Sequence, residues 1–165
     1  MKKIFIYILI AVALLSGFYI FSREAEPKLE IINGEEIISV DPYYLFSHPG
    51  IETFPSVVRS SGQKPVETSY TGIELSKLFE DLGIQPDEKI TLNAEDGYRI
   101  VISREELEEP HNVYLAFSRD GEVLESRKKG GNGPYQLIIR RDPFSQRWIK
   151  HVEVIIAAPS KGADN

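Results

Sequence analysis

Two neighbouring stretches, "TGIELSKLFEDLGI" (residues 71–84) and "KITLNAEDGYRIVIS" (residues 89–103), decide the fold class of this chain. In the first stretch, apolar side chains recur at helical spacing, and Gly83 can take the left-handed conformation that often ends a helix. In the second stretch, two apolar runs flank the turn dipeptide Asp96-Gly97, which predicts a β-hairpin. The residues that carry the helical pattern are Ile73 or Leu75, followed by Leu78, Phe79 and Leu82.

The rest of the sequence predicts mostly strands. Asn33-Gly34 and Asp120-Gly121 each sit between apolar runs and indicate two further hairpins, and "YQLIIR" and "WIKHVEVIIA" have the composition of strands. Ser103, followed three residues later by Glu106, is typical of a capping box and predicts one short helix. The sequence therefore predicts a single α+β domain that is mainly β.

The N-terminus has the pattern of a membrane anchor. Lys2 and Lys3 precede an uncharged apolar run at residues 4–21, which is close to the ~20 residues that a spanning helix needs. Small residues suited to signal cleavage are missing after this run, so we favour an uncleaved anchor over a secreted product. The lysines before the run predict an extracytoplasmic domain on a single-pass cell-membrane protein. We expect an anchor at 1–23, a domain at 24–158 and a frayed tail at 159–165.

The charge balance bears on the choice of partners. Residues 24–165 carry 16 Lys and Arg against 25 Asp and Glu, a formal charge of −9, which argues against a nucleic-acid partner. The cations nevertheless concentrate in the C-terminal third of the chain, which indicates either a local site for a small anionic ligand or a set of solvated loop ends. They are Arg119, Arg127, Lys128, Lys129, Arg140, Arg141, Arg147 and Lys150.

Few residues point to catalysis. The chain has no cysteine, which excludes a thiolate nucleophile, a zinc-thiolate site and a disulfide. The three histidines lie far apart, without metal-ligand spacing, and no serine has the flanking glycines of a nucleophile elbow. The loop "GGNGP" at residues 130–134 admits two interpretations, a phosphate cradle of backbone amides or a turn with charged ends.

The order of the segments is informative where single motifs are not. A small polar turn in "VVRSSGQK" is followed by the Gly-x-x-Leu helix start, an Asp-Gly-Tyr strand end, a hairpin with Asp-Gly and a later Leu, a Gly-Pro loop and a last strand with a Lys. Over roughly residues 29–156 this order resembles the sulfite-oxidase-type molybdopterin-binding domain. The residues that match the pattern of this family are Gly72, Leu75, Asp96, Gly97, Tyr98, Gly121, Leu124, Gly133, Pro134, Leu137 and Lys150.

The resemblance implies a molybdenum-molybdopterin cofactor held in a pocket. Ser60 stands at the position of the metal ligand and would be the catalytic residue, although the family uses a cysteine thiolate there and soft sulfur suits this metal better. Gln136 is a second departure, because many relatives carry an arginine at that place. The implied cofactor-binding residues are Gly62, Lys64, Asp96, Gly97, Tyr98, Gly133, Pro134, Arg140, Arg141 and Lys150.

Three functions remain open. The first is a membrane-anchored domain that binds the molybdenum cofactor in a redox role. The second is a non-catalytic pseudoenzyme that uses the same fold to bind a small ligand or a membrane-protein partner. The third is a mainly-β envelope or adhesion module. Whether the chain is an enzyme is therefore undecided at this level.

Overall fold

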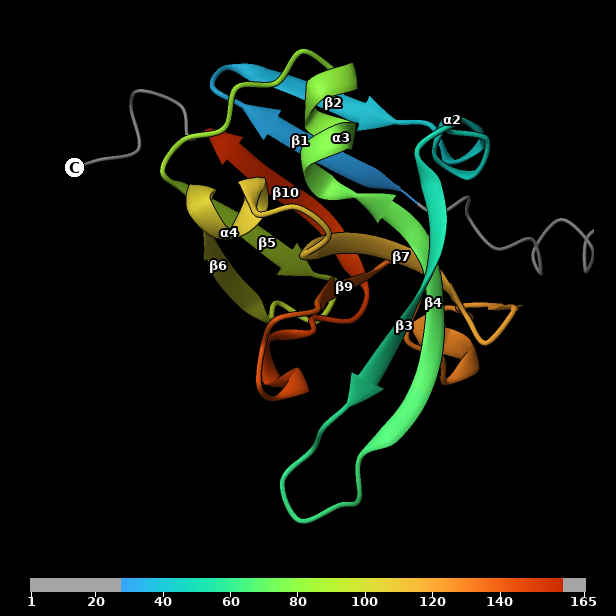
Figure 1. Cartoon of the computed structure of the whole chain (residues 1–165). Helices are drawn as coiled ribbons and strands as arrows, with labels where there is room; N and C mark the ends of the chain where they lie inside the picture. Colours follow the sequence, from blue (N-terminus) through green and yellow to red (C-terminus); the bar gives the residue numbers. More distant parts are fainter. Residues whose placement is uncertain (1–27, 159–165) are drawn as a thin grey trace, which may run out of the picture.

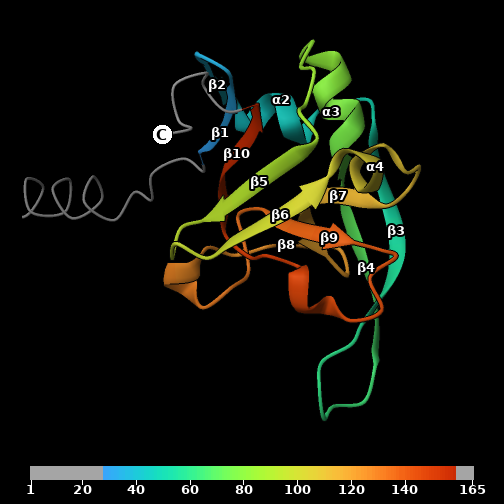
Figure 2. The ribbon, with the colours of Figure 1, turned by 90° about the vertical axis from the view of Figure 1, so that its left-hand side faces the viewer.

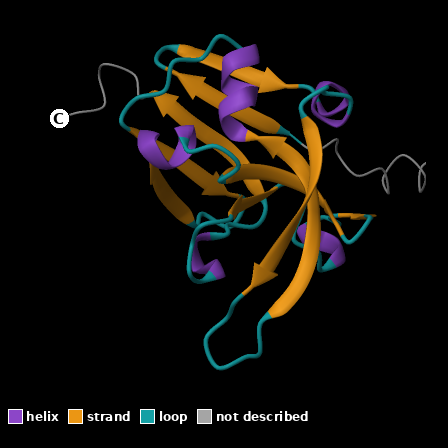
Figure 3. Cartoon of the chain, in the orientation of Figure 1, coloured by secondary structure: helices purple, strands orange, loops and turns teal. Residues whose placement is uncertain are grey.

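The computed structural model describes residues 28–158, which fold into two five-stranded sheets with short helices between strands (Figures 1 and 3). The predicted anchor at 1–23 and tail at 159–165 lie outside the described residues. Within residues 28–158, no helix has the length and apolar character needed to cross a membrane. The mainly-β prediction is confirmed.

One sheet brings the two ends of the described chain together. Its strand order is β2-β1-β10-β5-β6, in which β1 and β10 run parallel and the other neighbours antiparallel. Alternate residues of these strands point into the core. The strands are β1 (Leu29–Asn33), β2 (Glu36–Val40), β5 (Lys89–Ala94), β6 (Arg99–Ser103) and β10 (Val152–Ala158).

The second sheet is built on a long hairpin. Its order is β3-β4-β7, and the far edge of β7 pairs with β8 at one end and with β9 at the other. The tip of the β3–β4 hairpin extends beyond the rest of the domain, as both ribbon views show (Figures 1 and 2). The strands are β3 (Ile51–Val58), β4 (Val66–Glu74), β7 (Val113–Arg119), β8 (Glu122–Val123) and β9 (Gln136–Ile139).

The helices are short and lie at strand ends. Among them, α3 packs on β4 and β7 through three buried side chains, Leu75, Leu78 and Phe79. A single core of buried aliphatic and aromatic side chains runs between the two sheets. The helices are α2 (Pro42–Phe46), α3 (Leu75–Asp81), α4 (Arg104–Glu108) and the 3₁₀ turns η1 (Arg127–Lys129) and η2 (Ser145–Arg147).

The local predictions succeed where turn chemistry is explicit. Gly34, Gly97 and Gly121 have positive φ in the predicted hairpin turns, and the Ser103–Glu106 capping box is formed in both directions. The helix predicted from residue 71 starts later, because Thr71 to Glu74 continue β4. The apolar pattern of these residues fits a strand as well as a helix. In the structure, Gly72 and Ile73 are buried in the sheet, and the helix begins only at Leu75.

Candidate functional site: an arginine cleft and a carboxylate–histidine cluster

A cleft of about 410 Å³ opens between β3 and the loop that follows β9. One wall comes from the C-terminal half of β3, and the other from the residues just after β9 and from the loop before β7. We call it the arginine cleft, because three arginines line it. Its lining consists of Pro55, Ser56, Val57, Arg59, Pro110, His111, Arg140, Arg141 and Trp148.

The three arginines differ in how they are held. The Arg140 guanidinium lies over the ring of Phe54, 5.4 Å from its centroid, and donates to the carbonyl of His111 at 3.2 Å. Arg141 forms an ion pair with Glu109. Within residues 28–158, neither Arg140 nor Arg59 has a carboxylate partner. Two cationic groups therefore remain available to an anion in the cleft.

Backbone contacts fix the position of Arg59 at the end of β3. Its amide donates to the Ser145 hydroxyl at 2.9 Å, and its carbonyl accepts from the Ser145 amide at 3.0 Å. This pair of hydrogen bonds joins the hairpin to η2 across 86 residues of sequence. The Ser56 hydroxyl oxygen, from a residue that lines the cleft, is shielded from solvent and has no hydrogen-bond partner among residues 28–158.

The segment from η2 to β10 is anchored by a charged pair and an indole. Arg147 donates to Glu106 at 2.6 Å and pairs with Asp142. These contacts raise the pKa of Arg147 and hold the pKa of Glu106 below its usual range, with the Arg147 hydrogen bond outweighing the opposing effect of burial. Trp148 is 7% exposed, and its indole N–H donates to the carbonyl of Ile139 at 2.9 Å.

A second hollow, of about 290 Å³, lies on the other side of Trp148. Asp96, Tyr98 and Lys150 line it, together with Ser145 and other residues of the η2 segment. The Asp96 carboxylate accepts from the Tyr98 amide at 3.0 Å and so closes its own turn. The structure therefore brings Asp96, Tyr98 and Lys150 together, but in a different hollow from Arg140 and Arg141.

Three further residues that the resemblance singled out lie on the β3–β4 hairpin. Ser60, Gly62 and Lys64 form the tip of the β3–β4 hairpin and are exposed, with Gly62 at φ +74°. None of the three lines either hollow. The structure thus separates the candidate metal ligand from three of the cations expected to hold the cofactor, Arg140, Arg141 and Lys150, but not from Lys64.

The glycine loop at residues 130–134 forms backbone hydrogen bonds with the residues just before it. The amides of Gly130, Gly131 and Gly133 donate to the carbonyls of Arg127, Ser126 and Glu125. A Cβ atom at Gly133 would lie 2.0 Å from the Leu124 carbonyl oxygen, which accounts for the glycine before Pro134. This arrangement matches the turn interpretation, since these three amides are already used as donors. Gln136, the second departure from the family pattern, is buried in β9, and its Oε1 has no hydrogen-bond partner in the described part of the chain.

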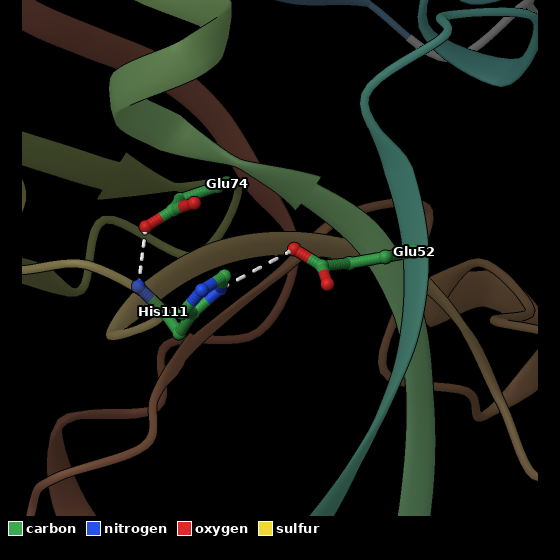
Figure 4. Close-up of side chains that lie close together, drawn as sticks. All are labelled: Glu52, Glu74 and His111. Atoms are coloured by element: carbon green, nitrogen blue, oxygen red, sulfur yellow. Dashed lines mark hydrogen bonds and ion pairs between the residues drawn. The ribbon is translucent and has the colours of Figure 1, made fainter.

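A cluster of three residues that no sequence pattern predicts lies beside the cleft. Glu52, Glu74 and His111, the carboxylate–histidine cluster, place one ligand atom each within 4.8 Å of one another (Figure 4). Glu74 is 4% exposed and accepts from the His111 amide at 2.6 Å, while His111 Nδ1 lies 3.8 Å from Glu52 Oε1. The three residues are far apart in sequence, so no spacing motif could have revealed them.

Neighbouring groups orient this cluster. The Tyr114 hydroxyl donates to Glu52 at 2.9 Å and lies 3.2 Å from His111 Nδ1. Burial and the adjacent carboxylates raise the pKa of Tyr114 well above its usual range, so it remains a donor. Lys77 lies 3.2 Å from Glu74 and 3.5 Å from Glu52. Burial opposes ionisation of Glu52, but the Tyr114 hydrogen bond and Lys77 outweigh it and lower the pKa of Glu52.

Comparison with known proteins supports a shared fold. No family of known proteins matches the sequence, and neither does any curated protein. Among solved structures, the sulfane dehydrogenase SoxCD from Paracoccus pantotrophus is similar with a TM-score of 0.63 and 20% sequence identity. The match covers 82% of this chain and 39% of that one, so this chain spans well under half the length of its neighbour. At this identity the likeness shows the fold and leaves the activity open.

Proposed function

We propose that this chain is a ligand-binding domain that holds a small anionic molecule in the arginine cleft and performs no redox step of its own. The observation that carries the proposal is the presence, in a cleft of about 410 Å³, of two guanidinium groups, Arg59 and Arg140, that have no carboxylate partner among the described residues. Guanidinium groups in such an arrangement suit phosphate, sulfonate or carboxylate oxygens. The cleft volume lies within the range of small-molecule sites.

The similarity to a sulfane dehydrogenase makes a molybdenum-pterin cofactor the first ligand to consider. The phosphate end of such a cofactor suits Arg59 and Arg140. The metal end does not suit this chain, because the sequence contains no cysteine and Ser60 lies exposed at the hairpin tip, outside the lining of both hollows. A neutral hydroxyl in water is a poor substitute for a thiolate ligand. We therefore favour the non-catalytic binding module over the redox domain.

We also propose that the domain works at the outer face of the cell membrane. The uncharged run at residues 4–21 behind two lysines supports an anchor, and a membrane-protein partner would meet the domain there. Extraction of membranes with alkaline carbonate tests the anchor: the full chain should stay in the pellet. Recovery in the soluble fraction would instead indicate a cleaved or peripheral protein.

Calorimetric titration of the full chain in detergent with inorganic phosphate and pyrophosphate tests the arginine cleft. Arg140→Ala should weaken binding at least tenfold, because a charge-assisted contact of this kind contributes about 1.5–3 kcal/mol. Lys64→Ala removes the same charge at the hairpin tip and should leave the affinity within twofold. Equal losses in the two variants would contradict the proposal, since they would indicate a general electrostatic effect.

Elemental analysis distinguishes the binding module from the redox domain. The chain, produced in a host that makes the pterin cofactor, should contain no stoichiometric molybdenum or tungsten. One equivalent of either metal would overturn the non-catalytic proposal and make Ser60 the first residue to substitute.

A further inference from the structure

The carboxylate–histidine cluster has the donor set of a metal site. Glu52 comes from β3, Glu74 from the end of β4, and His111 from the loop before β7, so three separate elements contribute one donor each. A mixed set of imidazole and carboxylate donors suits divalent transition metals. Figure 4 shows the Glu52 carboxylate facing the His111 imidazole, and a Glu74 carboxylate oxygen in contact with the His111 main-chain nitrogen.

The donors are held by contacts outside the set. His111 adopts a left-handed backbone conformation, with φ at +57°, and its amide donates to Glu74 Oε1. The Tyr114 hydroxyl donates to Glu52, in the manner of the outer hydrogen bonds that orient metal-binding carboxylates. Glu74 and Tyr114 are both buried, so two of the groups around the cluster have little freedom to move.

A cation already occupies the space between the two carboxylates. The Lys77 ammonium lies within 3.5 Å of Glu52 and 3.2 Å of Glu74, and its side chain is 42% exposed. Two carboxylates therefore share one mobile positive charge. Because the lysine stem is flexible and half in solvent, the ammonium can leave for water when a divalent ion arrives.

We propose that Glu52, Glu74 and His111 bind a divalent transition-metal ion, with Zn²⁺ the best match to these donors, and that Lys77 leaves the cluster when the ion binds. Zinc–ligand distances of about 2.0–2.2 Å require donor atoms within roughly 4 Å of one another. The observed spread of up to 4.8 Å is wider than this, so ion binding requires the donors to move closer together, and Glu52, whose side chain is 36% exposed, is placed to do so. His111 also lines the arginine cleft, so the ion would lie at one wall of that cleft.

Titration of the full chain with ZnCl₂, and with Co²⁺ followed by visible absorption, tests the site directly. We expect one saturable equivalent and a Co²⁺ spectrum of low coordination number. His111→Asn should weaken the affinity at least tenfold, and asparagine tolerates the left-handed conformation, so this variant is suited to the fold. Circular dichroism of the variant checks that the fold is kept.

Substitution of Lys77 gives the more specific test of the proposal. Lys77→Met should tighten Zn²⁺ binding at least threefold, because the competing ammonium is removed while the aliphatic stem remains. Lys128→Met removes the same charge from η1, away from the cluster, and should stay within twofold of the unmodified chain. The proposal is overturned by unchanged affinity in a folded His111→Asn protein, by equal effects of the two lysine variants, or by no saturable binding. None of these outcomes depends on the arginine cleft binding an anion.

Discussion

The tip and the stem of the β3–β4 hairpin belong to one pair of strands, but they have different surroundings. At the tip, residues 60–65 are exposed, and one backbone hydrogen bond, from Gln63 to Ser60 at 3.2 Å, closes the turn. Along the stem, Gly72 meets the backbone of β7, and Arg59 is bonded twice to Ser145. A binding site needs groups that are held in place, and the two bonds to Ser145 hold the backbone of Arg59, although this residue is exposed like those of the tip.

This difference explains why a matching motif and a binding site need not coincide. The polar tip has the small residues and the cation that the sulfite-oxidase-type resemblance expects at a cofactor site. The arginine cleft, in contrast, forms where the stem packs against segments from the C-terminal third of the chain. The four predictions below test whether the stem, and not the tip, carries stability and binding.

The largest effect is expected from a methyl group added to the stem. A Cβ at Gly72 would lie 2.3 Å from the Leu115 carbonyl oxygen, so Gly72→Ala must push β4 and β7 apart. We expect a loss of about 3 kcal/mol in the free energy of unfolding, measured by urea denaturation. Gly62→Ala at the tip meets no atom within 4 Å and carries only the cost of a left-handed alanine, about 1 kcal/mol. Equal losses would contradict the comparison.

Acid should lower the stability of the folded protein by protonating Glu106. The pKa of this carboxylate is lowered in the fold, so it stabilises the folded state fully above its unfolded pKa of about 4.3, and the contribution disappears as the pH falls through the folded value. Glu106→Gln should cost about 1–2 kcal/mol at pH 7. The difference from the unmodified chain should shrink below about pH 4 in urea denaturation. A difference that stays constant down to pH 3 would show that the carboxylate charge is not the cause.

A smaller effect is expected where the stem meets η2. Ser145→Ala removes the hydroxyl that accepts from the Arg59 amide but leaves the backbone bond in the other direction. We expect a loss of about 0.5–1 kcal/mol in stability and a weakening of phosphate binding smaller than that of Arg140→Ala. Thermal denaturation and calorimetric titration measure the two. Unchanged binding together with reduced stability would mean that Arg59 does not need this anchor.

The smallest effect is expected at the tip itself. Ser60→Ala should change stability by less than about 0.5 kcal/mol, as exposed substitutions usually do, and should leave phosphate binding unchanged. Parallel urea and titration curves with the unmodified chain measure this. A clear loss of binding would return Ser60 to the site and favour the redox function.

Much of the fold could be predicted, because it depends on local chemistry. Turn dipeptides such as Asp96-Gly97 fix a hairpin within a few residues, and the Ser103–Glu106 box encodes a helix start by itself. The start of α3 was misplaced because Thr71 to Glu74 suit a strand and a helix equally, and only pairing with β3 and β7 decides between them. Pairing between strands that are distant in sequence cannot be detected in a short window of residues.

The candidate sites were harder to predict for the same reason. Arg140 and Arg141 were selected from charge clustering, and the structure places both in one cleft. Arg59 was passed over, because its role depends on Ser145 from a distant segment. The carboxylate–histidine cluster joins residues 52, 74 and 111 through sheet order alone. Sequence patterns therefore identified the types of group but not which of them meet.

Trp148 is the sole tryptophan of the chain, and it lines both the arginine cleft and the second hollow. The intrinsic fluorescence of tryptophan in this protein therefore comes from a single point between the two hollows. Because the indole is 7% exposed and bonded to Ile139, its emission should be blue-shifted and poorly quenched by acrylamide. A ligand that enters either hollow would change the fluorescence emission of Trp148, so binding can be followed without an added label.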